Sequence, residues 1–340
     1  MNAHSRDPFL LDAEEDVRLA TYLSSAAEIF RKLATAAGAT SWMADDVGHW
    51  ARHPLGMGLA RLAIQGELTP SELQTGMTRL HQVPRETVQI ITSGGIAVDA
   101  DGASFSIDTD RGVSLALIPV DRHAAQAELD GHVESATVIL GETWRAYIRP
   151  VATLCLVEAT GYAAIPHYSG SSNSLFGAMQ SGGLTAPWVT AEVITHEAAH
   201  MWLSLIEDQE EFADDGWTEK GYLSPWRDDA RPISGIVHGV YVFSMVAAAL
   251  ARWVERGGPC TDEVQERLAL VCAQVRSAAA TVMGHPSVIP FVRVMTAAAL
   301  DRISASELAL PPEIMNRATD RLAEHAARWR AAHPHLVSAA

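Results

Sequence analysis

One stretch of the sequence, residues 188–206, combines a helical pattern with two histidines at helical spacing. It reads WVTAEVITHEAAHMWLSLI and contains an H-E-x-x-H motif at His196, Glu197 and His200. Residues four apart lie on the same side of an α-helix, so both imidazoles could bind one metal ion, with Glu197 about 100° further round. Three apolar residues extend the same side: Val189, Val193 and Leu203. The alternative is a pair of ordinary core or surface histidines, but an unpaired imidazole on an apolar face is costly, which favours a metal site.

The composition is that of a globular protein with a substantial core. The chain has 340 residues, of which 48% are hydrophobic and 19% charged. Its formal net charge of −16 argues against nucleic acid or an anionic membrane as the main partner. The three cysteines, Cys155, Cys260 and Cys272, lack the spacing of a disulfide framework or a thiolate metal site. Scattered thiols of this kind are typical of a reducing compartment.

No segment has the pattern of a secretory signal or a membrane span. The first residues are acidic rather than basic and then apolar. The longest apolar run, residues 239–251, is too short to cross a bilayer and is followed by Arg252. We therefore expect a soluble, cytoplasmic protein.

Hydrophobic periodicity predicts a mainly helical α+β fold. Besides 188–206, helices are expected at 14–37, 56–66, 70–81, 124–148, 235–256, 261–282, 286–303 and 311–332. Strand-like pieces occur at 86–92, 113–120, 151–159, 163–169 and 174–181. Short Gly- and Ser-rich breaks separate the last three, which favours a small antiparallel sheet beside the motif helix. We expect residues 1–340 to form a single catalytic domain, of which residues 1–95 could be a helical subdomain.

The third metal ligand decides the chemistry, and His238 is the strongest candidate. Leu203 and Ile206 stand where one class of metalloprotease has Gly and His, so that class is excluded. The acidic residues that follow the motif, Glu207, Asp208, Glu210 and Glu211, are expected to form a solvated turn. His238 lies in an apolar segment, where its ring needs a partner; the alternative is a core histidine bonded to a backbone carbonyl. Three imidazoles suit zinc, iron or copper, so the identity of the ligands does not choose the metal.

Two arginines stand shortly before His238, in the segment SPWRDDARP. Arg227 and Arg231 could bind a small dicarboxylate, because a guanidinium group binds a carboxylate through two parallel hydrogen bonds. A zinc peptidase has no evident need for such a pair. The alternative is that Asp228 and Asp229 simply pair with these arginines at the surface.

Three segments together resemble a known family. The combination of THEAAH, SPWRDDARPISGIVHGVYVF and SGSSNSLFGA is similar to the HExxH-type 2-oxoglutarate-dependent peptide β-hydroxylases, also described as HExxH-motif putative peptide modification proteins. The resemblance implies a mononuclear Fe(II) enzyme that consumes O2 and 2-oxoglutarate, hydroxylates a β-carbon of a ribosomally made precursor peptide, and releases succinate and CO2. It also implies a zincin-like helical domain rather than a double-stranded β-helix. A radical SAM cyclophane-forming enzyme would be a partner in the same pathway.

Carried over residue by residue, the resemblance makes His196, His200 and His238 the iron ligands, although zinc could take the place of iron. Arg231 would bind the distal carboxylate of 2-oxoglutarate, with Arg227 as the second choice. Glu197 would then orient a ligand or the bound acid. Two other functions remain open. One is a zinc metallopeptidase with Glu197 as general base, and the other is a non-catalytic protein that binds a leader peptide.

Overall fold

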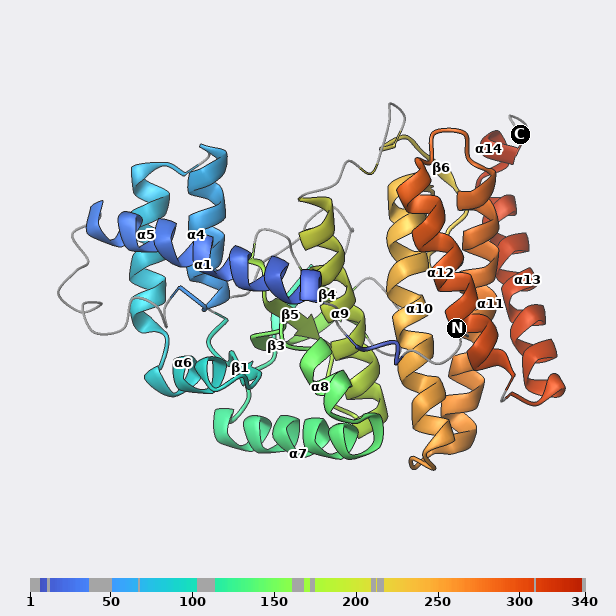
Figure 1. The fold of residues 1–340 in the computed structure, drawn as a ribbon, viewed down its shortest axis with the longest axis horizontal. Coiled ribbons are helices and arrows are strands. Elements are labelled where there is room, and N and C mark those ends of the chain that lie inside the picture. The colour runs from blue at the N-terminus through green and yellow to red at the C-terminus, as the bar shows by residue number, and fades with distance from the viewer. Residues whose placement is uncertain are drawn as a thin grey trace. The chain divides into compact units, whose positions relative to one another are not determined.

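The computed structural model is mainly helical and describes most of the chain (Figure 1). The described residues are 7–10, 13–36, 51–66, 68–102, 114–160, 168–171, 175–208, 212, 217–308 and 310–337. Their contacts divide the chain into two compact units. The sheet unit comprises Leu11–Thr137 and Arg145–Leu205, and the bundle unit comprises Met1–Leu10, Val138–Trp144 and Ile206–Ala340.

Among its described residues, the sheet unit begins with four helices that match the predicted pattern except for the last. They are α1 (Ala13–Ala36), α4 (Pro54–Gln65), α5 (Pro70–Gln82) and α6 (Arg85–Thr92). The first two pack against each other, and α5 packs on α4. The start of α5 is fixed by a capping box, in which Thr69 and Glu72 each bond the other's backbone N–H.

The prediction of a strand at residues 86–92 is wrong, because this β-rich piece forms α6. Pro84 precedes the helix in an extended conformation and Glu86 lies in its first turn, which suits a helix N-terminus. Val88 and Ile91 are both buried, at a spacing that puts them on one side of the helix. Burial of this helical face outweighs the β-propensity of the separate residues.

The sheet is mixed, not antiparallel as predicted. Its strands are β1 (Ala97–Val98), β2 (Ser114–Leu117), β3 (Thr153–Thr160), β4 (Ser169–Ser171) and β5 (Ala178–Ser181). Their order is β1-β3-β5-β4, with β2 also paired to β3. β3 runs parallel to β1 and β5, whereas β2 and β4 pair antiparallel. The chain between β1 and β3 contains two helices, which is the long crossover that a parallel pair requires. Most of the predicted strand at 163–169 lies outside the described residues.

Two helices replace the single one predicted at 124–148. They are α7 (Arg122–Leu140) and α8 (Glu142–Tyr147), separated by Gly141 at φ +90°, a left-handed conformation that interrupts the helix. Both contact the motif helix α9 (Pro187–Glu207): the Trp202 indole N–H donates to the carbonyl oxygen of Tyr147 at 2.8 Å, and Nδ1 of His132 lies 2.8 Å from Oγ1 of Thr190. These contacts fix α9 within the sheet unit.

The bundle unit is a set of long helices that follow a short strand pair. The elements are β6 (Lys220–Tyr222), β7 (Arg231–Pro232), α10 (Ile233–Glu255), α11 (Thr261–Gly284), α12 (Pro290–Glu307), α13 (Pro312–Ala332) and α14 (Pro334–Val337). α10, α11 and α12 pack against one another, and α13 packs on α11 (Figure 1). The N-terminal segment joins this unit through Asp7, whose carboxylate accepts hydrogen bonds from Arg252 and Thr143.

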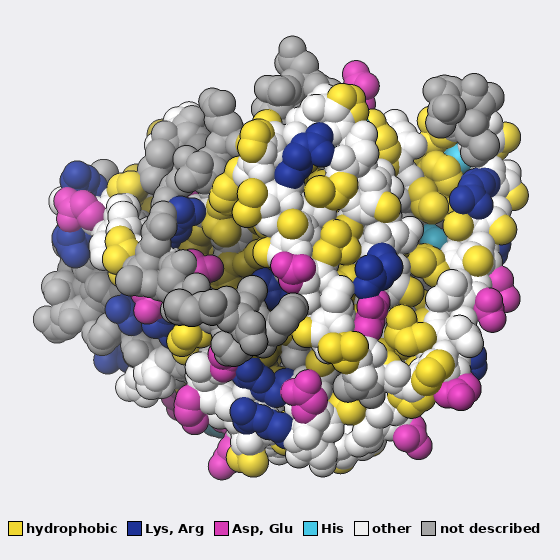
Figure 2. Space-filling model, turned by 45° about the vertical axis from the view of Figure 1, so that its right-hand side comes forward, with side chains coloured by type: hydrophobic (Ala, Val, Ile, Leu, Met, Phe, Trp, Pro, Cys, Tyr) yellow, Lys and Arg dark blue, Asp and Glu magenta, His cyan; other side chains and the backbone are white. Residues whose placement is uncertain are grey.

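α10 extends beyond the apolar run at residues 239–251 at both ends. Its 23 residues meet the length and hydropathy of a membrane span, but 67% of its most apolar stretch is buried inside the protein. That burial is typical of the core helix of a soluble protein. Figure 2 shows one face of the molecule, on which the hydrophobic side chains of the described residues are scattered among polar and charged ones.

Candidate functional site

The H-E-x-x-H motif lies on a helix with a buried face, as the sequence predicted. α9 spans Pro187–Glu207, and the apolar residues that flank the two histidines on their side, Val189, Val193 and Leu203, are all buried. The rings of His196 and His200 stand edge to face, with 4.9 Å between their centroids. Two imidazoles held this close on one rigid helix can ligate one metal ion.

Glu197 is a buried carboxylate beside this pair. Its side chain is 1% exposed, and its Oε1 lies 4.0 Å from Nε2 of His196. Neither of its carboxylate oxygens has a hydrogen-bond partner among the described residues. A carboxylate in such a place is costly unless a cation or a hydrogen-bond donor compensates it. A metal ion held by the two histidines would supply that compensation, so the three residues fit a metal centre.

Two further carboxylates on α9 share the side of the histidines. The sequence reasoning missed Glu192 and assigned Glu207 to a solvated turn. Glu192 is buried and lies one helical turn before His196. Glu207 ends the helix, about three turns after His196, which returns it to nearly the same side. The four-residue spacing of Glu192 from His196 could have revealed it, since carboxylates near ligand histidines commonly orient them.

His238 bonds to Glu207 in the bundle unit. His238 lies in the first two turns of α10, and its Nε2 is 2.5 Å from Oε1 of Glu207. Both side chains are about one-quarter exposed. The prediction of a solvated turn is therefore wrong for Glu207 and right for Asp208, which is exposed; Glu210 and Glu211 lie outside the described residues.

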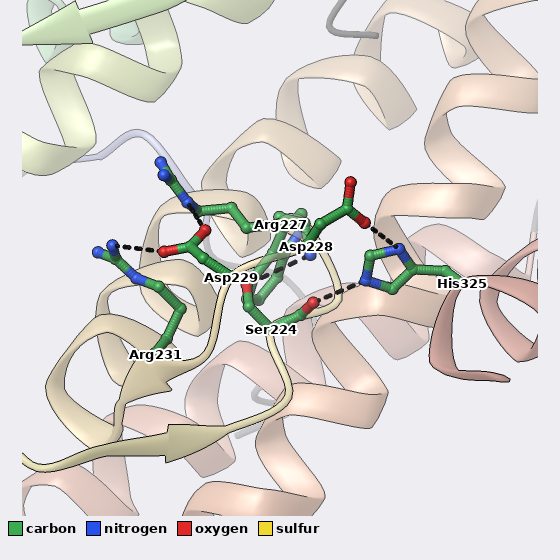
Figure 3. A network of polar contacts seen from close by, with 7 residues as sticks. Ser224, Arg227, Asp228, Asp229, Arg231 and His325 are labelled. Atoms are coloured by element: carbon green, nitrogen blue, oxygen red, sulfur yellow. Dashed lines mark hydrogen bonds and ion pairs between the residues drawn. The ribbon is translucent and has the colours of Figure 1, made fainter. Parts of the chain in front are cut away.

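The loop that carries the two arginines is anchored to three helices. The His325 ring on α13 lies with Nε2 2.9 Å from the carbonyl oxygen of Ser224 (Figure 3), and Gln274 on α11 donates to the carbonyl oxygen of Pro225 at 2.8 Å. Trp226 stacks on Phe243 of α10, with ring centroids 4.7 Å apart. Position 239 of α10 must be glycine, because a Cβ there would lie 2.3 Å from the Trp226 ring. The first residues of the loop are therefore held in place by these helices.

Arg227 and Arg231 converge on one carboxylate, that of Asp229 (Figure 3). Nε of Arg227 donates to Oδ1 at 2.7 Å, and Nη1 of Arg231 lies 3.4 Å from Oδ2. Burial alone would raise the pKa of Asp229, but the hydrogen bond from Arg227 and the charges of both arginines outweigh it and leave that pKa lowered. The alternative of internal pairing is confirmed for Asp229. Asp228 pairs instead with His325, whose Nδ1 lies 3.5 Å from Oδ1.

Gly235 makes room for the Arg231 guanidinium group. It lies in the first turn of α10, and a Cβ at this position would stand 3.2 Å from Nε and 3.3 Å from Nη2 of Arg231. The arginine therefore rests against the helix backbone, which fixes the direction in which its fork points.

The predicted ligands are distributed over the two units: His196 and His200 lie in the sheet unit, and His238 lies in the bundle unit. Within the described ranges, no group of three or more His, Cys, Asp or Glu side chains is placed to hold one metal ion. The role of His238 as third ligand stays a prediction. No protein-family model matches the sequence, and neither does any curated protein.

Proposed function

We propose that this protein is a cytoplasmic Fe(II)/2-oxoglutarate-dependent oxygenase that hydroxylates a β-carbon in a ribosomally synthesised peptide. The observation that carries the proposal is the convergence of Arg227 and Arg231 on one carboxylate, in the chain segment that leads into His238. A guanidinium pair that already holds the Asp229 carboxylate has the geometry to hold a carboxylate of a ligand.

In this function His196, His200 and His238 bind the iron. The first two are set by helical spacing on a buried face of α9. The third is oriented by Glu207, since a ligand histidine usually bonds a carboxylate or carbonyl through the ring nitrogen that faces away from the metal. Glu192, one turn before His196, is placed to act in the same way on that histidine.

Arg231 is the first choice for the distal carboxylate of 2-oxoglutarate, because its guanidinium group rests on the helix backbone at Gly235. Arg227 is the second choice. The iron, when bound, supplies the oxygen chemistry, and the protein supplies orientation and a dry surrounding. Three neighbours on α9 are fully buried and keep water from part of the surroundings of the histidines: Ala198, Ala199 and Leu203.

Glu197 has no proton to transfer in this proposal. Its carboxylate is 1% exposed and lies 4.0 Å from Nε2 of His196, which supports an orienting and charge-balancing role. The fold that accompanies the proposal is zincin-like in kind, and a radical SAM enzyme that acts on the same precursor peptide is the proposed partner.

A zinc metallopeptidase is the second candidate, and Glu197 is the observation that favours it. A carboxylate 4.0 Å from a ligand imidazole, with no other hydrogen-bond partner among the described residues, stands where a general base would activate a zinc-bound water. This function leaves the carboxylate contacts of Arg227 and Arg231 without a catalytic purpose.

One experiment distinguishes the two candidate functions. The protein is purified under nitrogen, its bound metal is measured, and succinate and the peptide product are followed after addition of Fe(II), 2-oxoglutarate, a candidate precursor peptide and air. The oxygenase produces succinate with Fe(II) and cleaves no peptide with Zn(II). Zinc-dependent cleavage of a peptide mixture, with no consumption of 2-oxoglutarate, would refute the proposal.

A further inference from the structure

Arg227 and Arg231 already bind a carboxylate of the protein itself, that of Asp229. A carboxylate of a ligand would have to compete with it for the two arginines. Resting on the function proposed above, we propose that Asp229 is an exchangeable internal ligand of Arg227 and Arg231, which the distal carboxylate of 2-oxoglutarate displaces. Asp229 would then set the affinity of the site for its dicarboxylate.

Exposure supports exchange, because the carboxylate is the outermost member of the group. The Asp229 side chain is 44% exposed, compared with 20% for Arg227 and 30% for Arg231. The arginines are thus held against the protein while the carboxylate between them faces water. An ion pair of this exposure contributes little to stability, so a ligand carboxylate can replace it at low cost.

The arginines have supports that do not depend on Asp229. The base of the Arg227 segment is held by the hydrogen bonds to the carbonyl oxygens of Ser224 and Pro225 and by the stacking of Trp226 on Phe243. Arg231 belongs to β7, and its guanidinium group rests over Gly235. When Asp229 moves away, the chain segment that carries Arg227 and the contact of Arg231 with Gly235 are both retained.

The neighbouring carboxylate provides a contrast within the same loop. Asp228 is 87% exposed and faces His325 instead of the arginines (Figure 3). The lowered pKa of Asp229 keeps its carboxylate charged at neutral pH, so the internal competitor is present under ordinary conditions. A charge-neutral substitution at 229 removes the competitor, whereas the same substitution at 228 leaves it.

The test is calorimetric titration of the full-length protein with 2-oxoglutarate, without added metal and again with Fe(II) under nitrogen. Asp229→Asn should bind 2-oxoglutarate roughly three- to tenfold more tightly than the wild type, the range expected from removing two exposed ion pairs. Asp229→Glu, which keeps the charge, should show no such gain, and Asp228→Asn should match the wild type. Arg231→Ala should weaken binding. Thermal unfolding of each variant establishes that it is folded.

The outcomes separate this inference from the function on which it rests. If the wild type binds 2-oxoglutarate and folded Asp229→Asn binds it equally or more weakly, Asp229 is a structural partner of the arginines and the inference is overturned alone. If neither protein binds it, both the inference and the proposed function fail. Tighter binding by Asp229→Asn in a protein that never forms succinate would support the exchange and refute the oxygenase.

Discussion

Oε1 of Glu207 lies 2.5 Å from Nε2 of His238, which joins the last residue of α9 to the first turns of α10. The contact is long-range in sequence and both side chains are largely shielded from water. It holds the side chain of the proposed third ligand in place within the bundle unit. A carboxylate bonded to an imidazole in this way fixes the ring and raises its basicity as a ligand.

Glu207→Gln tests this relationship. Gln keeps the size and one acceptor but loses the charge, so the protein should retain Fe(II) or Zn(II) about 10- to 100-fold more weakly. The measurement is metal affinity by competition with a chelator. The adjacent Asp208→Asn is the matched control, because Asp208 is exposed and should have no effect. Equal affinities in all three proteins would remove Glu207 from the metal site.

Glu197→Gln separates the two candidate functions. A peptidase that loses its general base should lose roughly 100-fold or more in rate. An oxygenase should keep part of its succinate formation, because the residue only orients a ligand. Parallel assays of both activities on the same purified variant give the comparison, and metal content checks that the site is still loaded. Complete loss of succinate formation at full metal occupancy would contradict the orienting role.

Gly235→Ala should disturb Arg231 without weakening the fold. A Cβ at 235 would stand 3.2 Å from Nε of Arg231, so the guanidinium group must shift. Alanine in a helix interior is more favourable than glycine by about 1 kcal/mol, so the melting temperature should not fall. We expect a several-fold higher KM for 2-oxoglutarate. Gly131→Ala on α7, where a Cβ meets nothing within 4 Å, is the control that should raise stability alone. An unchanged KM would move the carboxylate-binding role to Arg227.

The pH dependence of stability should report on His53. Burial, assisted by the charge of Arg79, outweighs the attraction of Asp99 and lowers the pKa of this imidazole from 6.5 to about 4. The folded protein therefore binds fewer protons than the unfolded chain between these two values. The contribution of His53 to the free energy of unfolding is fully present above pH 6.5. As the pH drops toward 4, the free energy of unfolding falls by roughly 3 kcal/mol.

Urea unfolding at several pH values measures this loss. His53 accepts a hydrogen bond from the backbone N–H of Leu55 and so caps α4. His53→Asn keeps a capping acceptor and removes the titration, so its stability should depend less on pH in this window. An identical pH dependence in the variant would assign the effect to other groups.

Periodicity in the sequence was sufficient to predict most of the helices and the place of the motif. The helix at 188–206 was predicted from the spacing of its apolar residues, and α9 extends this range by one residue at each end. The strand prediction at 86–92 failed because β-propensity is a weak preference that tertiary burial of Val88 and Ile91 overrides. The prediction of an antiparallel sheet holds for β4 and β5 but failed for β3 and β5, which run parallel because β4 lies between them in the chain and runs the opposite way; local sequence does not encode this pairing.

The candidate site, too, could be predicted from the sequence only in part. Helical spacing placed His196 and His200 together, since both belong to one helix. The partner of His238 could not be predicted, because Glu207 meets it only through the tertiary path between α9 and α10. The pairing of Asp229 with both arginines was foreseen as one of two alternatives, because close neighbours in a loop can reach one another in many conformations.

The most direct test of the proposed function is the origin of the oxygen in the product. The Fe(II)-loaded protein is incubated with 2-oxoglutarate, ¹⁸O₂ and a short precursor peptide encoded beside its gene, and both products are analysed by mass spectrometry. We predict one ¹⁸O atom in the peptide, at a β-carbon, and one in succinate, in equal amounts. Peptide cleavage that takes up oxygen from water, with 2-oxoglutarate unchanged, would contradict the account.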